Sequence, residues 1–168
     1  MILANYWKWL NGILTSNPTS TSYDDPVSDI GLKDKNGDAA YITLSSSDST
    51  RRYRVRDIND GAIWLGSGNG DIAATDYAMS SDCTASISNL NYTINSAGTD
   101  EGLSRTIAVT GTNNSGNSIT ITEVGYAKFV EGEQHGNTFV LIAKNKLNEA
   151  LTVADGSSFL INVAWSEV

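Results

Sequence analysis

Alternation of apolar and polar residues recurs through the C-terminal two thirds of the chain and predicts β-strands there. Turn residues separate strands expected at Ala62–Leu65, Cys83–Asn95, Leu103–Thr112, Ser118–Val130, Thr138–Lys144 and Ser158–Trp165. Many short strands without a convincing helix between them are typical of antiparallel sandwiches. We therefore expect an all-β fold, with an antiparallel β-sandwich or jelly-roll-like domain over residues 62–168.

The alternation also predicts which faces are buried. Ile107 and Val109 fall on one face of their strand, and the last strand has an apolar row of Phe159, Ile161, Val163 and Trp165. These rows are expected to form the core. Phe139–Ala143 is apolar on both faces, which places it in the middle of a sheet or beneath a subunit contact.

One strand changes its pattern near Glu123. Ile119 and Ile121 set the inward register, which Glu123 continues, whereas Val124 and Tyr126 fall in the opposite register. Either a β-bulge resets the strand, which we favour, or a carboxylate points inward and needs a partner.

The N-terminal residues 1–29 read as a short amphipathic helix followed by a flexible connector. Leu3, Trp7, Leu10 and Leu14 follow helical spacing, and Asn17-Pro18 ends the pattern. Such an apolar stripe must be buried. It packs either on its own domain, which is the commoner case, or on a neighbouring subunit, for which these residues would be the anchor.

Residues 30–61 are expected to contain a β-hairpin at Ile30–Leu44, whose turn is Lys35–Asp38, because Asn36-Gly37 suits tight turns. Asp34, Asn36 and Asp38 also match the first three ligand positions of a calcium-binding loop. The glycine and glutamate that such a loop needs further along are missing, so a turn is the stronger interpretation.

Arg52, Arg54 and Arg56 alternate with Tyr53 and Val55, so a strand here would carry three arginines on one face. The commoner explanation is a solvated face neutralised by neighbouring carboxylates. The alternative is docking onto an acidic protein surface, since arginine pairs well with carboxylates.

Charge and composition narrow the classes of function. The net charge is −8, which disfavours nucleic acid and anionic lipid as partners. The single cysteine, Cys83, excludes an internal disulfide and is expected to be a small buried residue at the start of a strand. We expect neither a secretion signal nor a membrane span, because no apolar run is long enough.

No group of residues predicts catalysis or a cofactor. The loop Gly66–Gly70 superficially resembles a phosphate-binding loop but lacks the following Lys-Ser/Thr pair, so a tight turn or a close backbone approach explains it better. Nucleophilic catalysis needs a base beside the nucleophile, and nothing in the sequence pairs the only histidine, His135, with a nucleophile. A sugar-stacking platform remains an alternative for the aromatic residues Trp64, Tyr77, Tyr92, Tyr126 and Trp165. We expect no enzyme, no metal and no cofactor.

From Ala62 to Val168 the order of motifs resembles a family of tailed-bacteriophage virion proteins. The motifs are Ile63–Gly68, Asp76-Tyr77, Asn113–Gly116, Ile119–Tyr126, Leu141–Lys144 and Ala154-Asp155-Gly156 before Phe159–Ile161. Within them we single out Gly66, Gly68, Asp76, Tyr77, Glu123 and Gly125 as structural loop positions. The proline-rich stretch usual after the glycine loop is replaced by Asn69–Ala74.

The resemblance implies a non-enzymatic virion structural protein, assembled in the host bacterial cytoplasm. We expect an auxiliary head component, a decoration or fibre-base protein, that binds major capsid or other virion subunits in many copies or as a homo-oligomer. The alternatives are a tail or collar component and a receptor- or glycan-binding module. Leu3, Trp7, Leu10, Leu14, Arg52, Arg54 and Arg56 are the candidate partner-binding residues.

Overall fold

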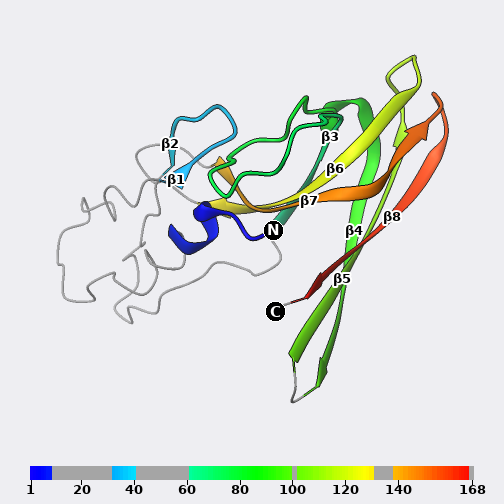
Figure 1. Cartoon of the computed structure of the whole chain (residues 1–168). Helices are drawn as coiled ribbons and strands as arrows, with labels where there is room; N and C mark the ends of the chain where they lie inside the picture. The colour runs from blue at the N-terminus through cyan, green and yellow to red at the C-terminus, as the bar shows by residue number, and fades with distance from the viewer. Residues whose placement is uncertain (9–31, 41–60, 100–101, 131–137, 167–168) are drawn as a thin grey trace, which may run out of the picture. The chain divides into compact units, whose positions relative to one another are not determined.

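The computed structural model describes residues 1–8, 32–40, 61–99, 102–130 and 138–166, and these residues are mostly β-strand (Figure 1). Residues 4–8 are helical. The strands are β1 (Leu32–Lys33), β2 (Ala39–Ala40), β3 (Gly61–Gly66), β4 (Ile87–Thr99), β5 (Gly102–Asn113), β6 (Ile119–Val130), β7 (Thr138–Val153) and β8 (Ser158–Ser166), with the 3-10 helix η1 (Thr84–Ser86) before β4.

The strands form two three-stranded sheets and a two-stranded hairpin. One sheet has the order β3-β6-β7 and the other β4-β5-β8, while β1 pairs with β2. The printed pairings, β1 with β2 and β5 with both β4 and β8, are antiparallel. The prediction of an all-β, sandwich-like fold with a short N-terminal helix is therefore confirmed.

Two strand boundaries differ from expectation. Cys83 precedes η1 instead of opening a strand, and the following strand begins at Ile87. Strand β7 continues to Val153, nine residues beyond Lys144. In its second half Leu147, Leu151 and Val153 alternate with exposed Lys146, Asn148 and Thr152, a period-two pattern that the prediction did not follow past Lys144.

The chain divides into two compact units whose residue ranges interleave. Unit 1 contains Met1–Ala62, Ile72–Ala78 and Tyr126–Lys144, and unit 2 contains Ile63–Asp71, Met79–Gly125 and Asn145–Val168. The sequence predicted consecutive segments (1–29, 30–61 and 62–168), whereas each unit draws on separated parts of the chain.

Unit 1 contains the predicted hairpin. Leu32 pairs with Ala40, and Gly37 in the turn has a φ of 86°, which glycine adopts without strain. Leu32, Ala40, Val140 and Ile142 form its apolar cluster, with Tyr6 and Tyr126 packed against them. The buried Asn5 side chain acts as a further partner of β1, because its Nδ2 donates to the Lys33 carbonyl (3.0 Å) and its Oδ1 accepts from the Lys33 amide (3.3 Å).

Unit 2 contains the predicted core rows. Ile107 and Val109 of β5 are buried, as are Phe159, Ile161 and Val163 of β8. The register places Val109 opposite Ile161 and Ile107 opposite Val163, so the two rows share one face of the sheet. These predictions are confirmed; the Trp165 side chain lies outside the described residues.

The turns of unit 2 converge on Asn113, which is fully buried at the end of β5. Its Nδ2 donates to the carbonyls of Asn117 (2.7 Å) and Val153 (2.9 Å), and its Oδ1 accepts from the Ser115 amide (3.0 Å). Its backbone also pairs with Ser157 and Gly156. The Asn113 side chain therefore joins the β5–β6 turn to the end of β7, and its backbone adds the β7–β8 turn.

Replacing Asn113 with alanine is expected to lower the free energy of unfolding by about 2–3 kcal/mol, because buried carbonyl and amide groups lose their partner. Asn114→Ala is the matched control. It removes one exposed hydrogen bond, to Ser88 Oγ, and should cost well under about 1 kcal/mol. Urea unfolding followed by circular dichroism measures both, and equal midpoints would contradict the role of Asn113.

Candidate functional site

The N-terminal segment lies along the edge of β7. The Leu3 amide donates to the Ile142 carbonyl (2.9 Å), the Lys144 amide donates to the Met1 carbonyl (3.0 Å), and the Met1 amine donates to the Lys144 carbonyl (2.8 Å). Ile2 and Ala143 form the bridge between the two segments. Residues 1–3 thus supply a short antiparallel partner for this edge.

This pairing bears on the prediction that Phe139–Ala143 lies either in the middle of a sheet or beneath a subunit contact, of which the second stays a prediction. The order β3-β6-β7 places β7 at one side of its sheet instead of in the middle. Val140, Leu141 and Ile142 are nevertheless buried, as the sequence predicted. The N-terminal residues explain how an outer strand has hydrogen-bond partners on its second edge.

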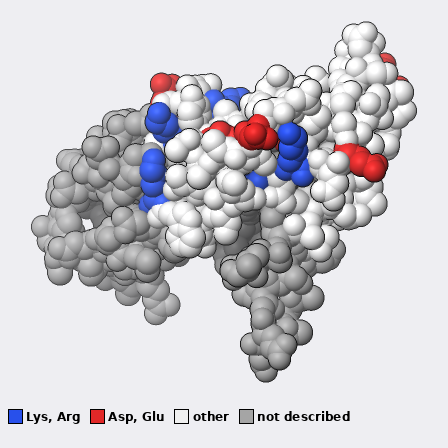
Figure 2. All heavy atoms as spheres, in the orientation of Figure 1, with Lys and Arg blue, Asp and Glu red and all other residues white. Residues whose placement is uncertain are grey.

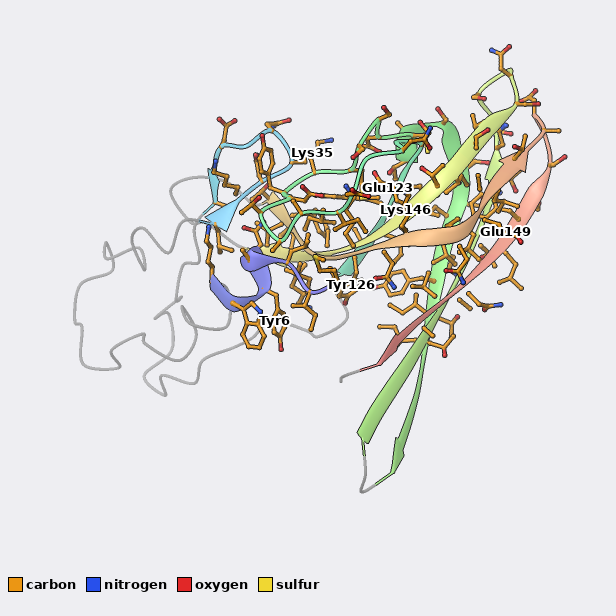
Figure 3. The ribbon with its side chains drawn as sticks, in the orientation of Figure 1. Tyr6, Lys35, Glu123, Tyr126, Lys146 and Glu149 are labelled. Atoms are coloured by element: carbon orange, nitrogen blue, oxygen red, sulfur yellow. The ribbon has the colours of Figure 1, made fainter. Side chains whose placement is uncertain are left out.

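The side chains of the N-terminal segment divide between buried and exposed. Leu3 is fully buried, whereas Met1, Ile2 and Trp7 are exposed, with Trp7 at 59%. Tyr6, labelled in Figure 3, packs edge-on against the Trp7 ring, with ring centroids 5.2 Å apart. Leu3 and Trp7 therefore do not share one buried stripe. We call Met1, Ile2 and Trp7 the N-terminal apolar group.

The remaining candidate partner-binding residues lie outside the described part of the chain. They are Leu10, Leu14, Arg52, Arg54 and Arg56, and His135 lies outside it as well.

Asp76 and Tyr77 fasten their loop within unit 1. Asp76 Oδ2 accepts from Lys144 Nζ (3.2 Å) and from the Ala73 amide (3.3 Å). Lys144 is almost fully buried and also donates to the Ala78 carbonyl (3.4 Å). A buried ammonium needs such partners, so the pair ties the loop to β7.

Tyr77 connects the same loop to the hairpin. The Lys33 ammonium lies 5.2 Å from the centre of its ring, within cation–π range. A Cβ atom at Gly37 would lie 3.2 Å from the ring, so the hairpin turn packs closely on it. The ring is engaged with its own chain, which leaves it poorly placed to stack on a sugar.

Glu123 is the second polar anchor, and it belongs to unit 2. It is 1% exposed, and the Ser80 amide donates to its Oε1. The inward carboxylate is thus the correct alternative of the two that the sequence left open. Ile121, in the same register as Glu123, is buried, and so are Thr122 and Val124 in the opposite register. Because both faces of the strand are buried here, apolar residues can occupy either register.

The glycine loop after β3 approaches this anchor closely. A Cβ at Gly66 would overlap the Glu123 carboxylate and lie 2.8 Å from the Ser80 carbonyl, and a Cβ at Gly68 would overlap Ser80. The Thr122 hydroxyl reaches the carbonyls of Gly66 and Gly68. The close approach predicted for this loop is therefore confirmed at both glycines. Gly125, the remaining structural position named from the sequence, is buried as well.

The loop is not arranged to bind phosphate. The amides of Ser67 and Gly68 donate to the carbonyls of Ser81 and Ser80, so they do not point at a ligand. Lys146 Nζ donates to the carbonyls of Asn69 (3.0 Å) and Gly70 (3.4 Å), as its position beside the loop in Figure 3 suggests. A phosphate cradle needs free amides and a free ammonium.

The Asp34 carboxylate of the hairpin turn bonds to backbone amides of the same turn. Asp34 Oδ1 accepts from the amides of Asn36 (2.8 Å) and Asp38 (3.0 Å). The turn interpretation is thereby confirmed. Within the described ranges no three His, Cys, Asp or Glu residues come together as metal ligands.

Sequence reasoning gave no role to Lys144 and did not consider Lys146 or Ser80. A signal for Lys144 was present, since Val140, Ile142 and Lys144 alternate in one register and all three are buried. Ser80 donates its backbone amide to Glu123 Oε1, and its carbonyl accepts from the Gly68 amide. Such backbone contacts leave no pattern in the sequence.

Comparisons with protein-family models, curated proteins and solved structures find no match for this chain. None of the helical segments in the described ranges has the length and apolar character needed to cross a membrane.

Substituting Gly66 with alanine is expected to destabilise the protein by about 1–3 kcal/mol, because the added methyl group overlaps Glu123 and the Ser80 carbonyl. Gly70→Ala is the control, since a Cβ there meets nothing within 4 Å. Thermal unfolding of the two variants separates the effects. A Gly66→Ala variant as stable as Gly70→Ala would rule out this close approach.

The rate at which the Cys83 thiol is alkylated is predicted to depend on pH. Burial, together with the charges of Asp82 and Glu123, raises the pKa of its thiol. A smaller fraction is therefore thiolate at any given pH, and alkylation by iodoacetamide should be slower than for glutathione. The rate should keep rising above about pH 8.5, where a small thiol is already half ionised. Mass spectrometry follows the single cysteine directly, and a profile that coincides with glutathione would contradict the prediction.

Proposed function

We propose that this chain is a non-enzymatic structural protein that assembles with other protein subunits as an auxiliary component of a tailed-phage particle. The single observation that supports it best is the N-terminal apolar group. A tryptophan that is 59% exposed lies on a segment held to β7 by three backbone hydrogen bonds.

A tryptophan in this position is suited to anchor a protein contact. Tryptophan is enriched among the residues that dominate binding energy, because its large rigid side chain buries much apolar surface at low entropic cost. The backbone pairing and the buried Leu3 hold the segment in place before binding. Preorganisation of this kind reduces the entropy that association must overcome.

The polar groups of the described sites support a structural role. Glu123, Lys144 and Lys146 each bond to loops of their own chain, and Asp76 and Tyr77 bind lysines of their own unit. Groups committed in this way stabilise loops and are poorly available to a substrate.

The resemblance of residues 62–168 to phage virion proteins supports assembly on a particle. We propose the head, as a decoration or fibre-base protein, with a tail or collar component as the alternative. Quantitative mass spectrometry of purified particles from a culture that makes the protein tests this directly. We expect the chain in many copies per particle, on heads separated from tails. Its presence in the lysate but absence from particles would overturn the proposal, and its presence on isolated tails would move it to the tail.

Replacing Trp7 with alanine is expected to lower the number of copies per particle at least about tenfold, since truncating an anchor tryptophan commonly costs 2 kcal/mol or more. Ile94→Ala is the control, because Ile94 is also an exposed apolar residue but belongs to unit 2. Circular dichroism of the purified variants verifies folding. Unchanged incorporation of Trp7→Ala would refute the anchor, and saturable glycan binding that depends on Trp7 would assign the segment to receptor recognition.

A further inference from the structure

Two Asn-Gly pairs of the described structure lie in very different surroundings. Asn36-Gly37 is in the turn of the hairpin and Asn69-Gly70 is in the loop after β3, whereas Asn11-Gly12 lies outside the described residues. An asparagine before a glycine is prone to spontaneous deamidation, because glycine has no side chain to keep its nitrogen away from the carboxamide. In a folded chain the outcome depends on the groups that surround this nitrogen.

Deamidation at such a pair begins when hydroxide removes the proton of the glycine amide. The nitrogen then attacks Cγ of the asparagine. A bond from this nitrogen to Cγ forms, the bond from Cγ to Nδ2 breaks, and the leaving nitrogen takes a proton from water and departs as ammonia. Water opens the resulting cyclic succinimide at one of its two carbonyls. Opening at Cγ gives aspartate, and opening at the main-chain carbonyl gives isoaspartate, whose backbone runs through Cβ.

The hairpin turn opposes this reaction at Asn36. The Gly37 amide donates to the Asp34 carbonyl (3.1 Å), so the proton that must be lost is held in a hydrogen bond. Asn36 Nδ2 lies 3.5 Å from Asp34 Oδ2, which also restrains the carboxamide. The negative charge of this carboxylate disfavours a second negative charge on the nearby glycine nitrogen. We therefore expect the turn to protect Asn36.

The loop after β3 leaves its own pair open. The amides of Ser67 and Gly68 are bonded, and the next bonded amide is that of Ala73. Within the described residues the Gly70 amide has no acceptor, and the Asn69 carboxamide has no hydrogen-bond partner. Both residues are exposed, and a Cβ at Gly70 would meet nothing within 4 Å. The succinimide ring therefore has room to close.

Lys146, labelled in Figure 3, adds an activating charge to the same peptide group. Its Nζ donates to the Asn69 carbonyl (3.0 Å), and this carbonyl shares a peptide bond with the Gly70 nitrogen. When the nitrogen loses its proton, the negative charge spreads onto the carbonyl oxygen, so a bonded ammonium stabilises the anion.

Other charges near this loop act more weakly. Asp71 follows the pair, but its side chain is exposed, so water screens it more strongly than an ammonium in direct contact. On the face seen in Figure 2, basic and acidic side chains are intermixed. Local contacts therefore decide which charge each of the two glycine nitrogens experiences.

We propose that Asn69 is a site of spontaneous deamidation in the folded protein, activated by Lys146, and that Asn36 is protected by its turn. The inference goes beyond the proposed function and does not depend on it. The product has a new carboxylate beside Lys146. In the isoaspartate form it also has an additional backbone carbon between the bonded amides of Gly68 and Ala73.

Peptide mapping by mass spectrometry tests the proposal on the folded full chain, after incubation in a mildly alkaline buffer and digestion in weak acid. We expect Asn69 to deamidate at least about tenfold faster than Asn36, because a hydrogen bond and a charge contact distinguish the two sites. In concentrated urea the two rates should approach each other, since both the turn and the Lys146 contact are lost.

Substitutions of Lys146 separate activation from exposure. Lys146→Gln removes the charge and should slow deamidation of Asn69 at least about threefold, whereas Lys146→Arg keeps the charge and should retain the wild-type rate. Lys35→Gln is the matched control, because it removes the same charge from an exposed position on the hairpin and should leave the Asn69 rate unchanged.

The direction of the change at Lys146→Gln is decisive. If Lys146 merely restrained the loop, its removal would raise the rate at Asn69. A rate that is unchanged or higher in Lys146→Gln would therefore overturn the proposal, and so would equal rates at Asn36 and Asn69 in the folded wild type. Circular dichroism verifies that the variants fold, which is expected because Lys146 and Lys35 are exposed.

Discussion

The requirement that a buried polar group must have a partner organises much of the described structure. Buried polar or charged side chains bond to backbone groups or to loop residues, as Asn5, Asn113, Thr122, Glu123 and Lys144 show. The net gain from each hydrogen bond is modest, but leaving any of the groups unpaired would be costly. Loops that have few apolar side chains are thereby fixed to the strands.

The strands were largely predictable because turn residues and period-two alternation are local signals. Ile107 and Val109 of β5 and Phe159, Ile161 and Val163 of β8 lie in the core as predicted. The failures have physical reasons that a single strand does not reveal. The second half of β7 was missed although Leu147, Leu151 and Val153 alternate with polar residues, because Glu149 interrupts the apolar register. The pairing of residues 1–3 with β7 joins segments about 140 residues apart in the chain.

The candidate site was predictable where backbone geometry demanded glycine, and less so where it depended on long-range polar contacts. Gly66 and Gly68 were correctly interpreted because the absence of a Cβ has few explanations besides close approach or a tight turn. The role of Glu123 was misjudged, since a bulge and a buried carboxylate produce the same break in alternation. The partner that decides between them, the Ser80 amide, is a backbone group.

The distribution of charge matters more for assembly than its sum. A net charge of −8 opposes the approach of two copies, but at physiological ionic strength this repulsion is screened beyond about 8 Å. A charge placed inside a contact is different, because it loses its hydration on burial and salt does not replace that loss. An acidic chain can therefore bind another protein where the contact is free of charge and its anchor is apolar. Trp7, which is 59% exposed close to residues that pair with β7, is an anchor of this kind.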